Sequence, residues 1–283
     1  MNVGGAGELE LLEQIKPYLG AESGDDDAAV IADATGFVVA STDMFVEGVH
    51  FDFVWMSAED VGWRSLALAL GDLAAKGAAP LWALSSLAMP KSWRVEHLTG
   101  LYAGMSDLGK QVKINIVGGD MSSTTGPAVL SLTVVGRTEM LPLARRQAQP
   151  GWFVAVTGAL GAAAVALRER RALHLVPLLA EGRRLNELGL CCGDISDGLV
   201  REMEKFAAMS GAGSVVYAGR VPRAQGASVE DALTSGEEAE LVCVGPREVI
   251  EKAGLTMVGE LTGDGRVEVS GAELESTGYD HFA

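Results

Sequence analysis

The sequence has few cysteines and few basic residues. Only three of its 283 residues are cysteine, Cys191, Cys192 and Cys243, and no two of them form a CxxC pair. This spacing matches neither a disulfide framework nor a zinc finger, so we expect a reducing compartment, the cytoplasm. Lysine and arginine number 22 against 38 aspartates and glutamates, which gives a net charge of −16. That excess of negative charge disfavours nucleic acid and anionic membranes as main partners.

Long hydrophobic runs are also missing. The first twelve residues carry no basic residue and no apolar run, so we expect no signal peptide. No stretch reaches the roughly 18 uninterrupted apolar residues of a membrane span, so we expect no transmembrane helix. Hydrophobic residues nevertheless make up 48% of the chain, enough for a substantial core. The length fits one large or two ordinary domains.

Three successive aspartates, Asp25, Asp26 and Asp27, follow Gly24 and precede a short apolar strand over residues 28–32. Adjacent carboxylates repel one another, and a divalent cation with a preference for oxygen ligands, such as Mg²⁺, removes that repulsion. The alternative is an acidic surface turn. A second strand is expected over residues 37–41, joined to the first by a hairpin turn. The hairpin would bring Asp27 close to Asp43, which follows the second strand.

A helix is predicted from Ala58 to Lys76, with Ser57 as its N-cap and Asp60 as a weaker capping-box partner. Asp72 lies on an apolar face of this helix. A carboxylate in such a place needs a partner. Either Lys76, four residues further on, or a metal ion would serve.

Two glycine-containing turns and a further acidic segment complete the pattern. Gly118-Gly119-Asp120 ends a strand expected over residues 115–117, and small residues there let a phosphate approach the backbone, although such turns are common. The turn over residues 157–161 precedes an Ala-rich helix, which suits either an anion at the helix N-terminus or plain strand–helix packing. Residues 194–199 hold two more aspartates.

The remaining periodicity predicts an α/β fold in two domains, residues 1–147 and 148–283, separated near a Pro-Gly turn at residues 147–151. We expect helices over residues 8–19, 93–109, 178–188 and up to 210, and strands over residues 81–88, 129–135, 153–156 and 237–244.

Taken together, these motifs resemble those of the thiamine-monophosphate kinases, a family within the superfamily of aminoimidazole ribonucleotide synthetase and selenophosphate synthetase. Eight motifs occur in family order over almost the whole chain, and their order is more specific than any one of them. They are Gly24–Val30, Ser41-Thr42-Asp43, Gly71–Pro80, Gly118-Gly119-Asp120, Pro150–Gly161, Asp194–Leu199, Ser235–Leu241 and Gly278–Phe282.

The resemblance implies an N-terminal α/β domain whose sheet forms the interface of a homodimer, followed by a C-terminal α/β domain. It also implies transfer of the γ-phosphoryl group of ATP to thiamine monophosphate, with several Mg²⁺ ions and thiamine diphosphate as the product. The accepting phosphate is already largely ionised at neutral pH, because its second pKa is about 6. The reaction therefore requires no general base, and none is evident in the sequence; the demand is for charge neutralisation.

The family's site residues transfer to this sequence position by position. The implied metal ligands, direct or through water, are Asp27, Ser41, Thr42, Asp43, Asp72, Asp120, Asp194 and Asp197. The implied ATP contacts are Tyr102, Gly119, Asp120, Arg145 and Ser196. The implied contacts to thiamine monophosphate are His50, Glu237 and Tyr279, with Phe282 anchoring the tail.

Some alternatives remain open at this stage. His50 could be a surface histidine and Tyr102 an ordinary aromatic of a helix face. Arg146 competes with Arg145 for the family's arginine, Trp152 and Ala239 depart from the usual motifs, and the segment before Asp194 is shorter than usual. The absence of a cysteine before Cys191 argues against a selenophosphate synthetase. Aminoimidazole ribonucleotide synthetase fits the tail and the Ser-Thr-Asp segment less well, and a non-catalytic Mg-nucleotide-binding protein has no need for clustered charge.

Overall fold

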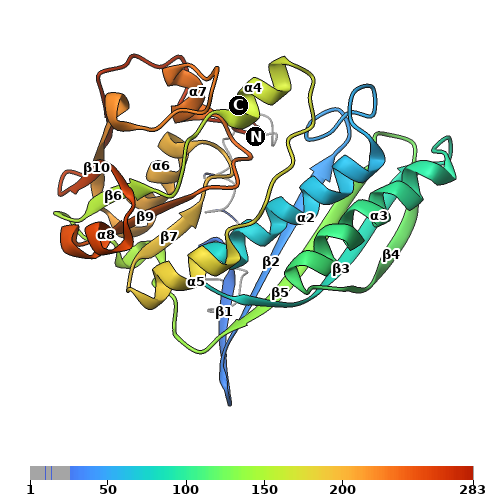
Figure 1. Cartoon of the computed structure of the whole chain (residues 1–283), viewed down its shortest axis with the longest axis horizontal. Helices are drawn as coiled ribbons and strands as arrows, with labels where there is room; N and C mark the ends of the chain where they lie inside the picture. The colour runs from blue at the N-terminus through green and yellow to red at the C-terminus, as the bar shows by residue number, and fades with distance from the viewer. Residues whose placement is uncertain (1–9, 11–13, 15–25, 283) are drawn as a thin grey trace.

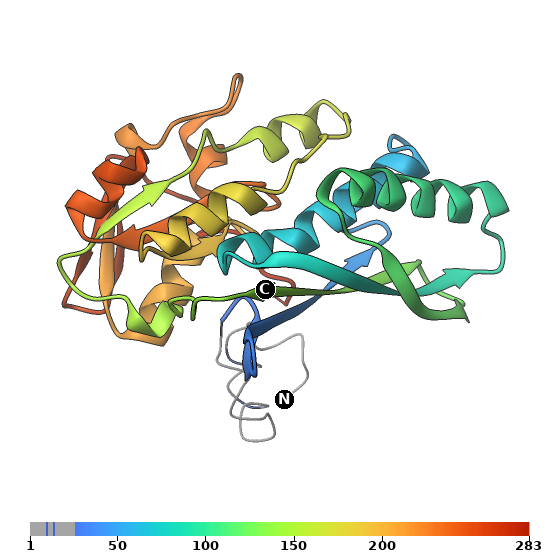
Figure 2. The same cartoon turned by 60° about the horizontal axis from the view of Figure 1, so that its bottom comes forward.

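The computed structural model describes Glu10, Gln14 and residues 26–282. The helix expected over residues 8–19 falls mostly outside this range, as do Gly24 and Asp25. Two sheets lie side by side, and helices pack against each of them (Figure 2). No helix in the described part of the chain is long and apolar enough to span a bilayer.

The first sheet contains five strands in the order β1-β2-β5-β3-β4. Helices α2 and α3 lie over one face of it, and no helix among the described residues covers the opposite face (Figures 1 and 2). Leu66, Leu70 and Leu73 of α2 are fully buried against the sheet, which is the packing that the apolar periodicity predicts. The bounds are β1 Ala29–Asp33, β2 Gly36–Val46, α2 Ala58–Ala75, β3 Ala79–Pro90, α3 Val95–Val112, β4 Ile116–Thr124 and β5 Val129–Thr138.

The predicted hairpin is confirmed, with Ala29 opposite Ala40 and Asp33 opposite Gly36. β2 is longer than expected because it pairs with β5 over its whole length, up to Val46 opposite Val129. The expectation that a strand ends at Gly118 is wrong. β4 continues to Thr124, because each residue from Gly118 onward pairs in parallel with β3.

Helix α2 begins as the sequence predicts. The Ser57 side chain accepts a hydrogen bond from the backbone N–H of Asp60, and the Asp60 side chain accepts one from the backbone of Ser57. Helices α2 and α3 pack with their backbones very close together. A Cβ atom added at Gly62 would lie 1.9 Å from the carbonyl oxygen of Leu101. Glycine is therefore required where the helices cross.

The second sheet has six strands in the order β11-β8-β10-β6-β9-β7. The chain changes sheet between Thr138 and Phe153, through the short helix η4, which is where the Pro-Gly turn lies. The division into domains at residue 147 remains a prediction. The bounds are η4 Arg145–Gln147, β6 Phe153–Val156, α4 Ala162–Arg168, α5 Leu179–Glu187, β7 Cys191–Asp194, α6 Leu199–Ser210, β8 Gly213–Tyr217, η5 Ala218–Arg220, α7 Val229–Thr234, β9 Leu241–Gly245, α8 Arg247–Ala253, β10 Thr256–Thr262 and β11 Val267–Ser270.

One segment of the second half is built into the core of the first half. Leu175 belongs to the same buried cluster as Leu66 and Leu70. Its carbonyl oxygen accepts a hydrogen bond of 2.6 Å from Nε1 of Trp63, and the ring of His174 stacks on Trp63 with centroids 3.8 Å apart. The segment between α4 and α5 therefore ties the two halves together beside α2.

The cysteines depart from the expectation. Cys192 on β7 and Cys243 on β9 lie opposite each other in register and form a disulfide, although they are 51 residues apart. Only strand pairing brings these positions together, so the argument from cysteine spacing to a reducing compartment no longer holds.

Candidate metal and phosphate site

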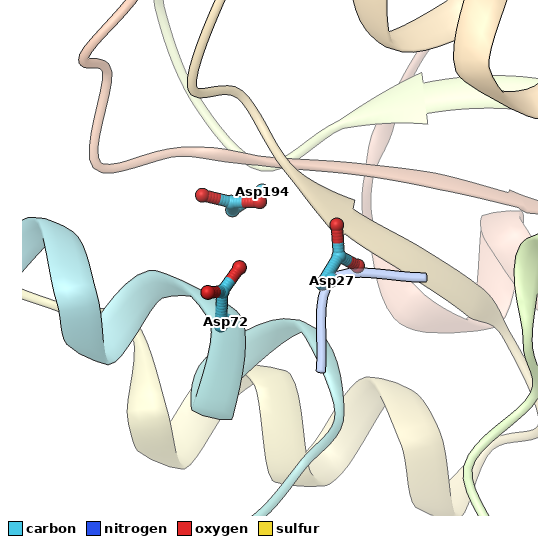
Figure 3. Close-up of side chains that lie close together, drawn as sticks. All are labelled: Asp27, Asp72 and Asp194. Atoms are coloured by element: carbon cyan, nitrogen blue, oxygen red, sulfur yellow. The ribbon is translucent and has the colours of Figure 1, made fainter. Parts of the chain in front are cut away.

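Three carboxylates meet between the two sheets. Asp27 lies just before β1, Asp72 lies on α2 and Asp194 ends β7, and one oxygen from each lies within 4.8 Å of the others. Figure 3 shows the three side chains directed toward a common space. They come from elements far apart in sequence, and the close approach of α2 to β7 is possible because α2 has Gly71 there, where an added Cβ would lie 3.2 Å from the Asp194 carboxylate.

The electrostatics of this cluster call for a cation. Burial, reinforced by the charges of neighbouring aspartates, raises the pKa values of Asp72 and Asp194 well above their usual range. Burial also acts to raise the pKa of Asp27, but the charges of Arg145 and Lys76 hold it below its ordinary value. Oδ2 of Asp27 is buried, and its contact is the ammonium group of Lys76 at 3.0 Å. Clustered carboxylate oxygens are a donor set that suits Mg²⁺.

Buried basic residues hold the first acidic motif in place. Lys76 Nζ lies 2.7 Å from Asp26 Oδ1 and 3.0 Å from Asp27 Oδ2. The guanidinium of Arg145 forms ion pairs with Asp26 and Asp27, and Nη2 lies 2.6 Å from Glu202 Oε2. The alternative of an Asp72–Lys76 pair is therefore wrong. The Asp72 carboxylate instead accepts a hydrogen bond from the Ser41 hydroxyl.

The predicted ligands of β2 divide between the two faces of the sheet. Ser41 and Asp43 point toward α2, and burial, followed by the charge of Asp197, raises the pKa of Asp43 to about 6. Thr42 points to the opposite face, where its hydroxyl lies 3.1 Å from that of Thr133. Asp120 is exposed on the edge strand β4. The structure therefore brings Asp43 and Ser41 to the carboxylate cluster but does not bring Thr42 or Asp120 there.

The segment after β7 adds a charged group beside the cluster. The Asp197 carboxylate lies 2.7 Å from Lys205 Nζ on α6, which also contacts Glu202 at 2.6 Å. Ser196 donates weakly into the same network, at 3.4 Å from Glu202. After burial, the charge of Asp197 is the next cause of the raised pKa of Asp43. Asp197 therefore lies near the cluster, and its place in the metal shell remains a prediction.

The predicted nucleotide contacts lie in different surroundings. Tyr102 on α3 is half-buried, with its hydroxyl 3.2 Å from the buried Ser85 hydroxyl on β3. The backbone of Gly119 packs closely against that of Ser85, because an added Cβ at Gly119 would lie 1.7 Å from the Ser85 carbonyl oxygen. Arg145 is buried and paired with three carboxylates, so its position favours support of Asp27 over contact with ATP. Arg146 is exposed.

The residues expected to contact the substrate lie near Arg64, about two helical turns along α2 from the Asp72 carboxylate. Arg64, on the face of α2 that also carries Asp72, forms an ion pair with Glu237. The His50 ring lies 5.1 Å from that of His281, which lies 4.7 Å from that of Tyr279. Arg64 and Asp72 are eight positions apart on one helix, so Arg64 lies roughly 12 Å from Asp72 along the helix axis. His50, Glu237 and Tyr279 are therefore brought together, although nothing in their sequence spacing required it.

The C-terminal tail is tethered to the start of α6. The backbone N–H of Tyr279 donates to the Asp197 carbonyl at 3.0 Å, and Arg201 Nη2 lies 2.6 Å from Asp280 Oδ2. Phe282 is 38% exposed, so polar contacts anchor the tail more than the Phe282 ring does.

Several residues of the site escaped the sequence analysis. Arg64 interrupts the apolar run of α2 just as Asp72 does, and that signal could have identified it. Glu202 and Lys205 gave no such signal. The anion expected at the N-terminus of α4 belongs to the protein itself, because Oε1 of Glu238 accepts from the backbone N–H groups of Gly161 and Ala163 at 2.9 and 3.2 Å.

Comparison with known proteins defines first the superfamily. Residues 24–138 match the family model described as AIR synthase related protein, N-terminal domain. These residues include β1 to β5 and the first two carboxylates of the cluster. The N-terminal half of the chain is therefore similar to the N-terminal domain of AIR synthase-related proteins.

The full-length relatives are more specific. The chain is 33% identical over 264 residues to thiamine-monophosphate kinase of Rhodopirellula baltica, covering 84% of this chain and 82% of that protein. It is 30% identical to the Methanospirillum hungatei enzyme of the same name, covering 97% and 99%. The solved structure of AaThiL complexed with AMPPCP and TMP has a TM-score of 0.90, 27% identity and 99% coverage of both chains. The chain belongs to the thiamine-monophosphate kinase family.

Proposed function

We propose that this protein transfers the γ-phosphoryl group of ATP to thiamine monophosphate, giving thiamine diphosphate and ADP. The observation that carries the proposal is the cluster of Asp27, Asp72 and Asp194, in a chain whose fold matches that of AaThiL, a protein solved with AMPPCP and TMP. This reaction is the last step in making thiamine diphosphate. The use of ATP favours a cytoplasmic location.

The chemistry needs charge neutralisation more than proton transfer. The accepting phosphate carries most of its second negative charge at pH 7, so no residue has to remove a proton from it. Magnesium ions held by Asp27, Asp72 and Asp194, with Asp43 and Ser41 close by, would supply positive charge to the facing phosphates. Lys76 and Arg145 keep Asp27 ionised in the protein interior, so this ligand is ready before a metal ion binds.

The nucleotide would be held by residues around the first sheet. We assign Tyr102, Gly119, Asp120 and Ser196 to ATP. We assign Thr42, Asp120 and Asp197 to the metal shell, directly or through water. We assign Arg145 an indirect role, because it forms ion pairs with Asp26 and Asp27 of the acidic motif. Thr42 and Asp120 reach a bound phosphate or metal ion only from the uncovered side or edge of the sheet.

That uncovered face also supports a homodimer. Met44 on β2 is 60% exposed, and Trp82 and Leu84 are 38% and 37% exposed on β3, with β5 between the two strands. Apolar side chains on a helix-free face commonly pack against a second copy of the sheet. We therefore propose that the first sheet forms the dimer interface.

The experiment is direct turnover. Purified protein with ATP, Mg²⁺ and thiamine monophosphate should form thiamine diphosphate and ADP in equal amounts, and EDTA should abolish the reaction. The Asp72→Asn variant should be inactive, whereas Asp107→Asn, an exposed residue paired with Lys110, should match the parent. ADP formation without thiamine diphosphate, or no turnover in a folded and metal-loaded protein, would exclude the proposed activity.

A further inference from the structure

Glu202, on helix α6, is a fully buried carboxylate that joins two cations. It is 0% exposed. Its Oε2 atom accepts a hydrogen bond of 2.6 Å from Nη2 of Arg145, and its Oε1 atom accepts one of 2.6 Å from Nζ of Lys205. A buried charge is costly unless it is paired. Each oxygen atom of this carboxylate binds a different cation, so Glu202 fixes the two cations relative to each other.

Each of these cations also binds a carboxylate of the metal and phosphate site. Arg145 forms an ion pair with Asp27, one of the three carboxylates shown in Figure 3. Lys205 Nζ lies 2.7 Å from Oδ2 of Asp197. Asp27 lies just before a strand of the first sheet, whereas Asp197 follows a strand of the second. Glu202 therefore links carboxylates from both halves of the chain, through one cation on each side.

The space between β7 and α6 is shaped for the guanidinium of Arg145. A Cβ atom added at Gly193 on β7 would lie 2.6 Å from Nη2 of Arg145. On α6, the ring of Phe206, four residues after Glu202, has its centroid 5.4 Å from Cζ of Arg145. Glycine on one side lets the guanidinium enter this space, and the aromatic ring on the other side supports it. Arg145 is therefore held in contact with Glu202.

The three N–H donors of the Lys205 ammonium group are directed at protein groups. The ammonium contacts the carboxylates of Asp197 and Glu202 and, at 3.4 Å, the hydroxyl of Ser196, which together match its three donors. Its charge also reaches the cluster. Burial, followed by the charge of Asp197, raises the pKa of Asp43 to about 6, and the charge of Lys205 opposes this increase. These contacts favour a role in orienting Asp197 over direct contact with a substrate.

We propose that Glu202 is the positioning residue of the metal site. Through Arg145 it orients Asp27, and through Lys205 it orients Asp197, so that carboxylates from the two halves of the chain face the same Mg²⁺ ions. The inference rests on the proposed function, because it concerns the metal site of that reaction. Groups that bind to metal ligands fix the orientation of those ligands, and their loss typically weakens metal binding or activity about 10- to 100-fold.

The first test replaces Glu202 by glutamine, which keeps the shape of the side chain but removes its charge and one acceptor. Glu202→Gln should raise the dissociation constant for Mg²⁺ by about 10-fold or more, measured by calorimetric titration of the whole, EDTA-treated and dialysed protein with MgCl₂. The Mg²⁺ concentration for half-maximal turnover should rise by a similar factor. Saturating Mg²⁺ should restore most of the kcat, and the KM for thiamine monophosphate should stay at the parental value.

The second test separates orientation from charge alone. Lys205→Met removes a positive charge near the carboxylates, so electrostatic attraction by itself predicts tighter binding of Mg²⁺. If Lys205 orients Asp197, the same variant should bind Mg²⁺ several-fold more weakly. Asp231→Asn is the matched control, because it breaks a bidentate pair with Arg168 in the same half of the chain. It should leave the dissociation constant for Mg²⁺ unchanged.

The outcomes separate this inference from the proposed function. If the parent binds Mg²⁺ but does not phosphorylate thiamine monophosphate, the proposed function is wrong, and the titrations still decide the role of Glu202. A folded Glu202→Gln protein with parental affinity for Mg²⁺ would overturn the inference. Tighter binding of Mg²⁺ by Lys205→Met would also overturn it, and this comparison decides the matter if Glu202→Gln does not fold.

Discussion

The ammonium group of Lys76 lies 3.0 Å from a carboxylate oxygen of Asp27, inside the protein and directly behind the carboxylate cluster. Lys76 is 1% exposed and is the C-cap residue of α2, and Asp27 lies just before β1. Together with Arg145, Lys76 supplies positive charge beside the cluster of Asp27, Asp72 and Asp194. These buried positive charges offset part of the repulsion among the clustered carboxylates.

Replacing Lys76 by methionine should therefore destabilise the protein. The change leaves Asp26 and Asp27 buried with Arg145 as their remaining strong partner, and breaking a buried pair from one side typically costs about 3 kcal/mol or more. Urea denaturation in EDTA measures the free energy of unfolding. Lys110→Met, which breaks an exposed pair with Asp107, should change it by less than about 1 kcal/mol. Equal effects of the two substitutions would show that the buried pairs do not support the cluster.

Replacing Asp43 by asparagine should remove most of the activity. Asp43 is half-buried on the same face of β2 as Ser41 and lies near the charges of Asp197 and Asp27. Loss of a carboxylate that holds or orients metal ions removes several kcal/mol of transition-state stabilisation, which corresponds to roughly a 100-fold or larger decrease in kcat. The measurement is kcat at saturating Mg²⁺ and ATP, with Asp107→Asn as the control. Near-parental kcat in a folded Asp43→Asn protein would remove Asp43 from the metal site.

The carboxyl group at the N-terminus of α4 should make stability depend on pH. Burial raises the pKa of Glu238 to about 6, against the opposing effect of the N–H groups that it accepts from. Because the folded pKa lies above the unfolded value of 4.5, the stabilisation from this group is full below about pH 4.5 and is lost as the pH rises through 6. The difference of about 1.5 units corresponds to about 2 kcal/mol.

Denaturation of the parent and of Glu238→Gln between pH 4.5 and 7.5 checks this prediction. The parent should lose about 2 kcal/mol more than the variant on going from the acidic to the neutral end. Glu251→Gln, on the exposed face of α8, should follow the parent. Parallel curves for the parent and Glu238→Gln would contradict the raised pKa.

The tail should act on substrate binding more than on stability. Tyr279 is 47% exposed beside His281. Its backbone N–H donates to the carbonyl oxygen of Asp197, and its carbonyl oxygen accepts from Nε of Arg201. An aromatic ring against the cationic thiazolium contributes about 0.5–2 kcal/mol, so Tyr279→Ala should raise the KM for thiamine monophosphate roughly 3- to 30-fold. The KM for ATP and the thermal midpoint should change little.

Phe282→Ala is the comparison, and it should lower the thermal midpoint through lost packing. Since Phe282 is 38% exposed, the decrease should be smaller than for a core phenylalanine. If Tyr279→Ala changes both KM values equally, or only the thermal midpoint, then Tyr279 has a structural role.

The helix-free face of the first sheet should hold two copies together. Met44→Glu places a charge at its 60% exposed position on β2, so it should convert a dimer to a monomer in multi-angle light scattering at micromolar concentration. Leu167→Glu alters a leucine that is 64% exposed on α4 and should leave the mass unchanged. A parent protein that is itself monomeric would exclude the interface.

The sequence by itself determined those features that depend on neighbours along the chain. The Ser57–Asp60 cap, the apolar face of α2 and the hairpin between β1 and β2 each follow from local spacing, and all are found in the structure. The same reasoning identified Asp27, Asp72 and Asp194, because clustered or buried carboxylates are costly wherever they occur and therefore stand out in a sequence.

Only the tertiary structure decided which groups became partners. Lys76 could have paired with Asp72 on its own helix, but the approach of the acidic motif gave it Asp26 and Asp27. The turn before α4 suited a phosphate in the sequence, but the fold places the Glu238 carboxylate at this helix N-terminus. The pairing of β7 with β9 places Cys192 opposite Cys243. The free energy of each of these contacts depends on burial and on groups tens to more than a hundred residues away. Local spacing carries no information about either, so the partners of Arg64 and Arg145 appeared only with the fold.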